Sequence, residues 1–204
     1  SYLRFKEQMQ GQKQIFWEEE IHCGDRIREL DQELDELETE IKQLKSNQMV
    51  FPKNAEAAKR IIYEELKQQG IQTDVRLFAE LVQEVKDAEW RVAIETFLGR
   101  KRFYIIVDGQ YCHKAMEVLE RRKLHGVHVV ITDKLPETDI SAGSAAEMLV
   151  IPNVYARRYA NYLLNGIHLC GSLEELHEYP RGGLMKNGML AKSYAVSPLS
   201  LIHI

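Results

Sequence analysis

The 204-residue sequence is poor in cysteine and proline and has no long apolar run. Its three cysteines lack CxxC spacing, which argues against a disulfide framework and fits a reducing cytoplasm. No apolar stretch approaches the roughly 18–20 residues that a membrane-spanning helix needs. We therefore expect a cytoplasmic protein without a membrane partner.

Motifs for nucleotide binding are also missing. The sequence contains neither GxxxxGK[ST] nor GxGxxG, the glycine-rich patterns whose backbone amides hold phosphate groups. Within these residues we accordingly expect no nucleotide site and no catalytic, cofactor-binding or metal-binding residue. This argues against an enzyme in this part of the protein.

Asp108 and Asp133 are the one pair of carboxylates that could contradict this view. Each follows a predicted strand, and ligands gather at the carboxyl ends of parallel strands. Two carboxylates there could hold Mg²⁺, so a magnesium-dependent TOPRIM-like nuclease or phosphotransferase is the alternative function. Aspartate after a strand is also a common turn or helix-capping residue, and no DxD motif accompanies this pair.

Charge is distributed unevenly along the chain, although the net charge is only −4. Residues 1–49 hold seven basic and twelve acidic residues, whereas residues 91–128 hold eight basic and four acidic ones. The basic residues cluster before a predicted strand and at the end of the following helix, which places both clusters at one end of the sheet. Such a patch could contact DNA phosphates without reading sequence, or could be an ordinary solvated rim. The candidate DNA contacts are Arg100, Lys101, Arg102, Arg121, Arg122 and Lys123.

The N-terminal quarter has the pattern of a coiled coil. Apolar residues alternate at spacings of three and four, which is the heptad rule for a seam between helices. The seam consists of Ile27, Leu30, Leu34, Leu37, Ile41 and Leu44. No second heptad segment follows, so the seam needs a partner from another chain or from further sequence. A single amphipathic helix lying on the body is the other interpretation.

The remaining sequence predicts short strands alternating with helices. A helix after Asp87 shows the apolar stripe Trp90, Ala93, Ile94, Phe97 and Leu98, and Gly99 ends it. Runs at 103–107 and 127–131 predict strands, and the helix 111–123 between them implies a parallel crossover. In that helix we expect Ala115, Met116, Val118 and Leu119 to point inward.

A second, degenerate copy of this arrangement follows at 158–179, where a helix, a stop, a strand, a turn and a helix recur. Residues 182–196 then predict a hairpin with a two-residue turn at Asn187-Gly188. The expected organisation is an arm (1–46), a Pro-marked joint with a connecting helix (47–70), a first half (71–136), a linker (137–144), a second half (145–196) and a tail (197–204). Its end, "LSLIHI", is similar to a translated sequencing adapter, or is a genuine short apolar tail.

In its order of elements the sequence resembles the hinge of SMC (structural maintenance of chromosomes) ATPases. "AIETFLGRKRFYIIVDGQYCHKAMEVLERRKLHGVHVVITDKL" is similar to the first hinge half, and "YLLNGIHLCGSLEELHEY…GLMKNGML" is similar to the second. The stretches "FPKNAEAAK" and "VKDAEWRVAIETFLG" resemble bacterial MukB-like and Wadjet-type (JetC) members more than ordinary SMC proteins. The glycine-rich closing signature of ordinary hinges is reduced here to Gly182-Gly183 and Gly188.

The resemblance implies an α/β body of two subdomains with short strands, preceded by a long coiled-coil helix. It also implies a homodimer that joins two arms into a DNA clamp or a loop-extruding complex in chromosome maintenance or plasmid defence. ATP, Mg²⁺ and kleisin-type subunits would belong to head domains outside these residues, and the location would be the nucleoid. By the logic of SMC hinges, residues 182–196 of one chain should meet the first half of the other. The candidate interface residues are Gly182, Gly183, Gly188, Met189 and Leu190.

Two further interpretations differ in what they predict. A zinc-hook relative is disfavoured because such proteins dimerise through CxxC, which this sequence lacks. A coiled-coil adaptor without a DNA role predicts that reversing the charges of Arg100–Arg102 leaves DNA affinity unchanged.

Overall fold

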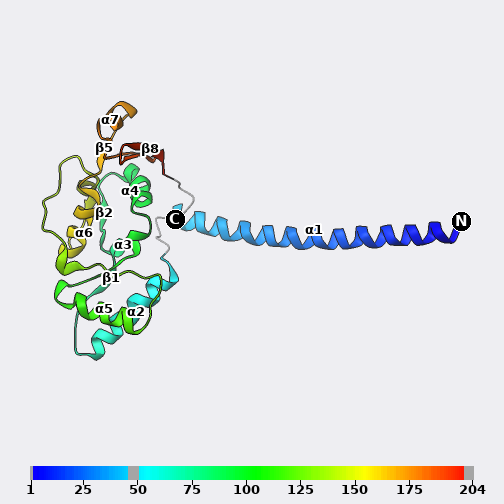
Figure 1. The fold of residues 1–204 in the computed structure, drawn as a ribbon, viewed down its shortest axis with the longest axis horizontal. Helices are drawn as coiled ribbons and strands as arrows, with labels where there is room; N and C mark the ends of the chain where they lie inside the picture. The colour runs from blue at the N-terminus through cyan, green and yellow to red at the C-terminus, as the bar shows by residue number, and fades with distance from the viewer. Residues whose placement is uncertain (1, 46–50, 200–204) are drawn as a thin grey trace. The chain divides into compact units, whose positions relative to one another are not determined.

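The computed structural model describes residues 2–45 and 51–199. These fall into two compact units, Ser1–Val50 and Phe51–Ile204 (Figure 1). No helix among the described residues is long and apolar enough to cross a membrane.

The described part of the first unit is a single helix, α1 (Tyr2–Lys45). Its 44 residues correspond to about 66 Å at 1.5 Å per residue. The seam residues Ile27, Leu30, Leu34 and Leu37 are 58%, 43%, 56% and 55% exposed, respectively. The side chains of Ile41 and Leu44, the other two predicted seam positions, lie outside the described part. The four described seam residues are thus uncovered along a continuous helix, and their pairing with a partner helix stays a prediction.

The second unit begins with a small core that joins helix α2 to a two-stranded sheet. Around this core lie α2 (Lys53–Gln68), β1 (Val75–Leu77), β3 (Ile105–Val107) and α5 (Cys112–Arg121). Helices α2 and α5 lie side by side (Figure 1) because each turns an apolar stripe inward, Ile62 and Leu66 on α2 and Ala115 and Val118 on α5. The prediction that Met116 points inward is wrong, since this side chain is exposed.

The strands of this core differ in detail from the sequence prediction. β3 starts at Ile105, not at residue 103, because residues 99–103 form a 3₁₀ helix. The run 127–131 forms only one isolated parallel bridge, between Ile105 and Val129, so the predicted crossover is parallel but its second strand is minimal. The sequence missed β1, which pairs antiparallel with β3.

A larger core draws on both predicted halves. It is built by α3 (Phe78–Leu81), α4 (Arg91–Leu98), α6 (Val154–Leu164) and the strand pair β2 (Glu84–Val85) and β4 (Leu149–Val150). The predicted stripe of α4 is confirmed, with Trp90, Ala93, Ile94 and Leu98 buried and Phe97 partly buried. Because β2 pairs with β4, the two halves share a core. The 3₁₀ helices are η1 (Ala88–Trp90), η2 (Gly99–Phe103), η3 (Gly109–Tyr111), η4 (Thr132–Lys134) and η5 (Ala145–Met148).

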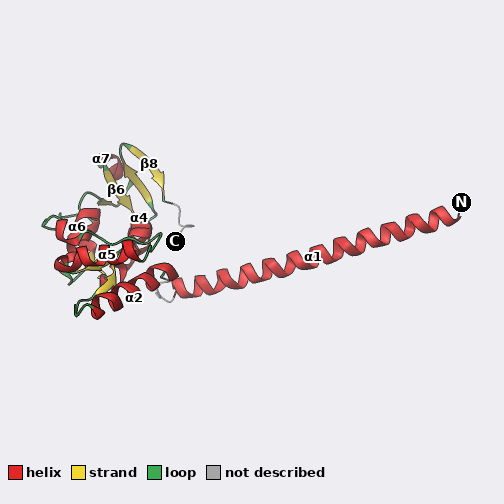
Figure 2. Ribbon diagram, turned by 60° about the horizontal axis from the view of Figure 1, so that its bottom comes forward, coloured by secondary structure: helices red, strands yellow, loops and turns green. Residues whose placement is uncertain are grey.

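The C-terminal part is a four-stranded sheet in the order β5-β6-β7-β8, with helix α7 (Leu173–Glu178) beside it (Figure 2). The strands are β5 (His168–Cys170), β6 (Gly182–Met185), β7 (Met189–Lys192) and β8 (Ala195–Pro198). The predicted order of helix, strand, turn and helix at 158–179 is confirmed. β5 is parallel to β6, and the other pairs are antiparallel.

The predicted hairpin is present, but its turn is longer than expected. Three residues separate β6 from β7, and the Gly188 N–H donates to the Met185 carbonyl at 2.9 Å. Gly188 has a φ of +85°, so this is a turn closed by a glycine bulge instead of a two-residue turn.

The sheet also continues beyond the boundary expected at residue 196. Ser197 pairs with Leu190, Pro198 pairs with Met189, and the Leu199 N–H donates to the Gly188 carbonyl. Residues 197–199 are therefore part of the sheet. The rest of the predicted tail lies outside the described residues.

Candidate dimer and DNA interfaces

Strand β8 is an edge strand whose outer side is open. Within residues 2–45 and 51–199 it pairs only with β7. The Leu199–Gly188 hydrogen bond sets the alternation along this antiparallel pair, so Ser197 and Ala195 bond inward to β7. The N–H and C=O of Val196 consequently point away from the sheet. An unpaired backbone edge of this kind is a template for another strand.

The side chains of β8 are exposed as well. Val196 is 54% exposed, and Tyr194, in the turn before it, is 75% exposed. That turn has two residues, Ser193 and Tyr194, with φ values of +53° and +63°, as a tight hairpin turn requires. Pro198 has no N–H, so it restricts how far a second strand can pair along this edge. Val196 and Tyr194 were not predicted as surface residues; the signal in the sequence was one β-branched residue, Val196, shortly before a proline.

The glycines predicted for the dimer interface are buried within their own chain. A Cβ at Gly182 would lie 1.9 Å from the Gly166 carbonyl oxygen, and one at Gly183 would lie 2.8 Å from a Leu176 methyl group. Gly188 is buried in the hairpin turn. Close packing of β6 against neighbouring backbone and α7 therefore accounts for Gly182 and Gly183, and the positive φ of the turn accounts for Gly188. Met189 and Leu190, the other two predicted interface residues, are half-buried.

Lys186 links the β6–β7 turn to η1, the 3₁₀ helix that precedes α4. Its ammonium lies 3.2 Å from the Asp87 carboxylate, bonds to the Glu89 carboxylate, and sits 5.6 Å from the centre of the Trp90 ring. The hydrogen bonds that the Lys186 ammonium donates to Glu89 and then to Asp87 raise the pKa of Lys186. The hairpin is thereby held against the first half.

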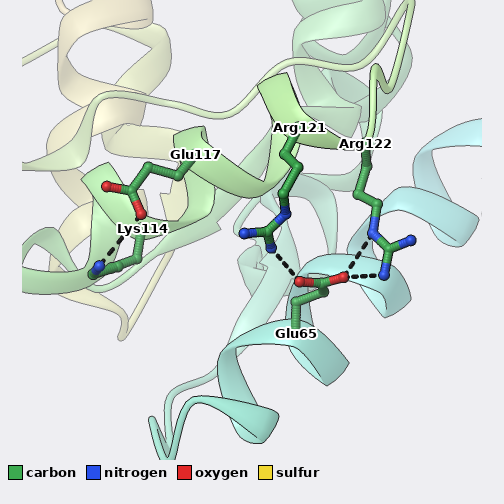
Figure 3. Close-up of polar contacts among 5 residues, drawn as sticks. All are labelled: Glu65, Lys114, Glu117, Arg121 and Arg122. Carbon is green, nitrogen blue, oxygen red and sulfur yellow. Dashed lines mark hydrogen bonds and ion pairs between the residues drawn. The ribbon is translucent and has the colours of Figure 1, made fainter.

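The six predicted DNA contacts divide into paired and unpaired cations. Arg102 is only 4% exposed, and its Nη1 donates to Glu95 at 3.1 Å, so it is no longer a candidate contact. Burial lowers the pKa of Arg102, and the Glu95 charge opposes this shift. Arg121 and Arg122 are half-exposed but both donate to the Glu65 carboxylate (Figure 3).

Three of the six cations remain free. The side chains of Arg100, Lys101 and Lys123 are exposed, and in the described chain none forms a hydrogen bond or an ion pair. The segments that follow them enter the sheet together, since the Ile105 N–H donates to the His128 carbonyl at 2.8 Å. The two basic clusters therefore precede neighbouring segments of the same sheet, as the sequence predicts, and three of their six cations are free.

The two carboxylates of the enzyme alternative have structural partners. Asp108 accepts from the Gln110 N–H at 3.0 Å, where it caps η3, and from the Tyr155 hydroxyl at 3.2 Å. Asp133 lies 3.4 Å from the Lys134 ammonium. Over the described ranges, no group of three or more His, Cys, Asp or Glu side chains could hold a metal ion. The geometry gives the enzyme alternative no support.

Comparison with known proteins identifies the fold. The family model for the SMC proteins Flexible Hinge Domain matches residues 73–179, more than half of the chain. The chain belongs to the SMC hinge family. Hinges of this family mediate dimerisation in SMC proteins and are non-catalytic modules.

Solved SMC hinge structures share the fold. The Pyrococcus furiosus SMC hinge domain matches at 23% identity and a TM-score of 0.51, covering 71% of this chain and 84% of that one. The same hinge with an extended coiled coil matches at 22% and 0.52, covering 86% and 68%. An asymmetric dimer of the Geobacillus stearothermophilus hinge matches at 18% and 0.54, covering 86% and 78%. No curated protein matches the sequence.

Proposed function

We propose that this hinge joins two copies of its protein through the open edge of β8. The observation that carries the proposal is the outward-facing N–H and C=O of Val196 beside exposed apolar side chains. An edge strand pairs readily with a second strand, and alternate side chains then add specificity. The edge of one copy would meet the first half of the other, so the contact would occur twice in a symmetric dimer.

The arm and the cations extend this proposal to DNA. Two hinges that dimerise would link two α1 helices. Each α1 has an exposed apolar seam that can pack against a partner helix. The free cations Arg100, Lys101 and Lys123 would contact phosphates without reading sequence. Head domains that bind ATP and Mg²⁺, with kleisin-type subunits, would complete a clamp for chromosome maintenance or plasmid defence. The stretches "FPKNAEAAK" and "VKDAEWRVAIETFLG" resemble MukB-like and Wadjet-type proteins, which supports placing this hinge near those members of the family.

The dimer proposal is tested by removing one backbone donor. Val196→Pro removes the outward N–H and leaves the Ser197 and Ala195 bonds to β7 in place. Val196→Ala is the matched control, because it shortens the side chain but keeps the N–H. The mass in solution of residues 1–204 and 51–199 is measured by light scattering over a concentration series.

We expect a dimer for both lengths of chain, a shift toward monomer for Val196→Pro, and a smaller shift for Val196→Ala. A folded monomer at all concentrations for residues 51–199 would overturn the proposal. A dimer that Val196→Pro leaves unchanged would place the interface elsewhere.

The DNA contact is tested separately with Arg100→Glu/Lys101→Glu. Since both side chains are free, the double variant should bind a DNA duplex more weakly and with a smaller salt dependence. Unchanged DNA affinity would favour the adaptor without a DNA role.

A further inference from the structure

Glu65 pairs with two arginines that would otherwise extend the free basic surface. Arg121 Nη2 donates to Glu65 Oε2, and Arg122 donates to Oε1 through Nε at 2.6 Å and also through Nη2 (Figure 3). The hydrogen bond from Arg122, together with the charges of both arginines, lowers the pKa of Glu65. The carboxylate is therefore ionised at neutral pH and carries one negative charge between two positive ones.

The packing of two helices puts Glu65 in this position. Its neighbours on the inner stripe of α2, Ile62 and Leu66, pack into the core that Val118 of α5 shares. Glu65 consequently stands at the border of the α2–α5 contact, with a side chain that is 13% exposed. The side chains of Arg121 and Arg122, which donate to this carboxylate, are 55% and 56% exposed.

The arginines keep the capacity to bind a second anion. Each guanidinium has five N–H donors, and Glu65 engages one from Arg121 and two from Arg122. Lys123, the next residue, is exposed and free. Ion pairs of half-exposed arginines are individually weak, so phosphate groups can compete for them.

We infer that Glu65 competes with DNA phosphate for Arg121 and Arg122. Without DNA, Glu65 holds both arginines against α2; when a duplex binds at the basic end of the sheet, its phosphates replace the Glu65 carboxylate. This inference rests on the proposed DNA contact through Arg100, Lys101 and Lys123. It adds that Glu65 regulates how strongly the same surface binds DNA. The hinge would bind DNA weakly through its free cations and gain two more contacts when phosphates displace the carboxylate.

Glu65→Gln tests this competition, because glutamine keeps an acceptor for the arginines but removes the negative charge. Glu117→Gln is the matched control: it makes the same charge change on α5, where Glu117 contacts Lys114 and His113 at 3.3 Å and neither arginine (Figure 3). Binding of the full chain to a mixed-sequence DNA duplex of about 30 base pairs is followed by fluorescence anisotropy between 50 and 200 mM salt.

We expect Glu65→Gln to tighten binding about three- to tenfold at low salt and to steepen the salt dependence by roughly one to two units. Glu117→Gln should change affinity less than twofold. Adding Arg121→Gln/Arg122→Gln to Glu65→Gln should cancel the gain. Equal effects of the two Glu→Gln changes would show a general charge effect and overturn the inference, as would a gain that persists without the two arginines.

A second measurement uses the unaltered chain, so it does not depend on how any variant folds. Phenylglyoxal modifies exposed arginines, and mass spectrometry locates the modified residues. DNA should protect Arg121 and Arg122 as well as Arg100. Protection of Arg100 alone overturns the Glu65 inference and leaves the proposed DNA contact standing, whereas no protection and no salt-dependent binding overturns both.

Discussion

Gly182→Ala is expected to destabilise the hinge itself and not only its dimer. The added Cβ would lie 1.9 Å from the Gly166 carbonyl oxygen, whereas real Cβ contacts are essentially never under 3.0 Å. β6 and the backbone that leads into β5 must therefore move apart by about 1.1 Å. A backbone hydrogen bond between β5 and β6 of the usual length, about 2.9 Å, would be broken by a displacement of that size. The obstacle is backbone, so no side-chain rotation can relieve the clash.

Overpacking of this severity costs about 1–3 kcal/mol, and the loss of strand pairing puts Gly182→Ala at the upper end of that range. For a unit of this size, 2–3 kcal/mol corresponds to a fall in Tm of about 4–12 °C. Thermal unfolding of residues 51–199 measures it, with Gly171→Ala as the control because a Cβ there meets only a carboxylate oxygen at 3.6 Å. A Gly182→Ala hinge within about 0.5 kcal/mol of the unaltered protein would refute the steric reasoning.

Two further predictions concern cysteine reactivity and pH. Cys23 is exposed, whereas Cys112 and Cys170 are buried, and burial raises the pKa of Cys170. Iodoacetamide at pH 8 should therefore label Cys23 alone in the folded chain. Equal labelling of all three cysteines would show that the two buried sites open to solvent. The raised pKa of Lys186 means that its link to Asp87 and Glu89 stabilises the hinge below the unfolded lysine pKa and is lost as pH rises through the folded one. The pKa of Asp87 is lowered, first by the Glu89 N–H and then by Lys186, so its contribution is lost as pH falls through that depressed value. The stability of Lys186→Met in urea unfolding should therefore differ from that of the unaltered protein at pH 7, and the difference should shrink as the pH rises through the raised pKa of Lys186. A difference that stays constant with pH would assign the effect to packing on Trp90.

Local patterns predicted the elements that depend on near neighbours. The heptads of α1, the buried stripe of α4 and the hairpin at 182–192 all follow from spacing, because a helix or hairpin brings together residues a few positions apart. β1 was missed because its three residues are too short for a period. Its pairing with β3, about 30 residues further along, is a tertiary contact.

The candidate sites were less predictable than the fold. Arg100, Lys101 and Arg102 are equivalent as a run of charges, but the 3₁₀ turn at 99–103 buries Arg102 against Glu95 and leaves the other two in solvent. The pairing of Glu65 with Arg121 and Arg122 spans 56 and 57 positions, so no local signal announces it. Likewise, Gly182 and Gly183 suggested an interface, and only the position of β6 shows what surrounds them.

The sequence by itself determined the arm, its heptad pattern and the order of helices and short strands, because each depends on residue type and spacing along the chain. The tertiary structure decided which cations are free, which glycines serve internal packing, and which backbone groups of β8 face outward. Those properties depend on burial and on charge pairing between segments distant in sequence, and the packing of α2 on α5 and of β6 on β5 brings those segments together.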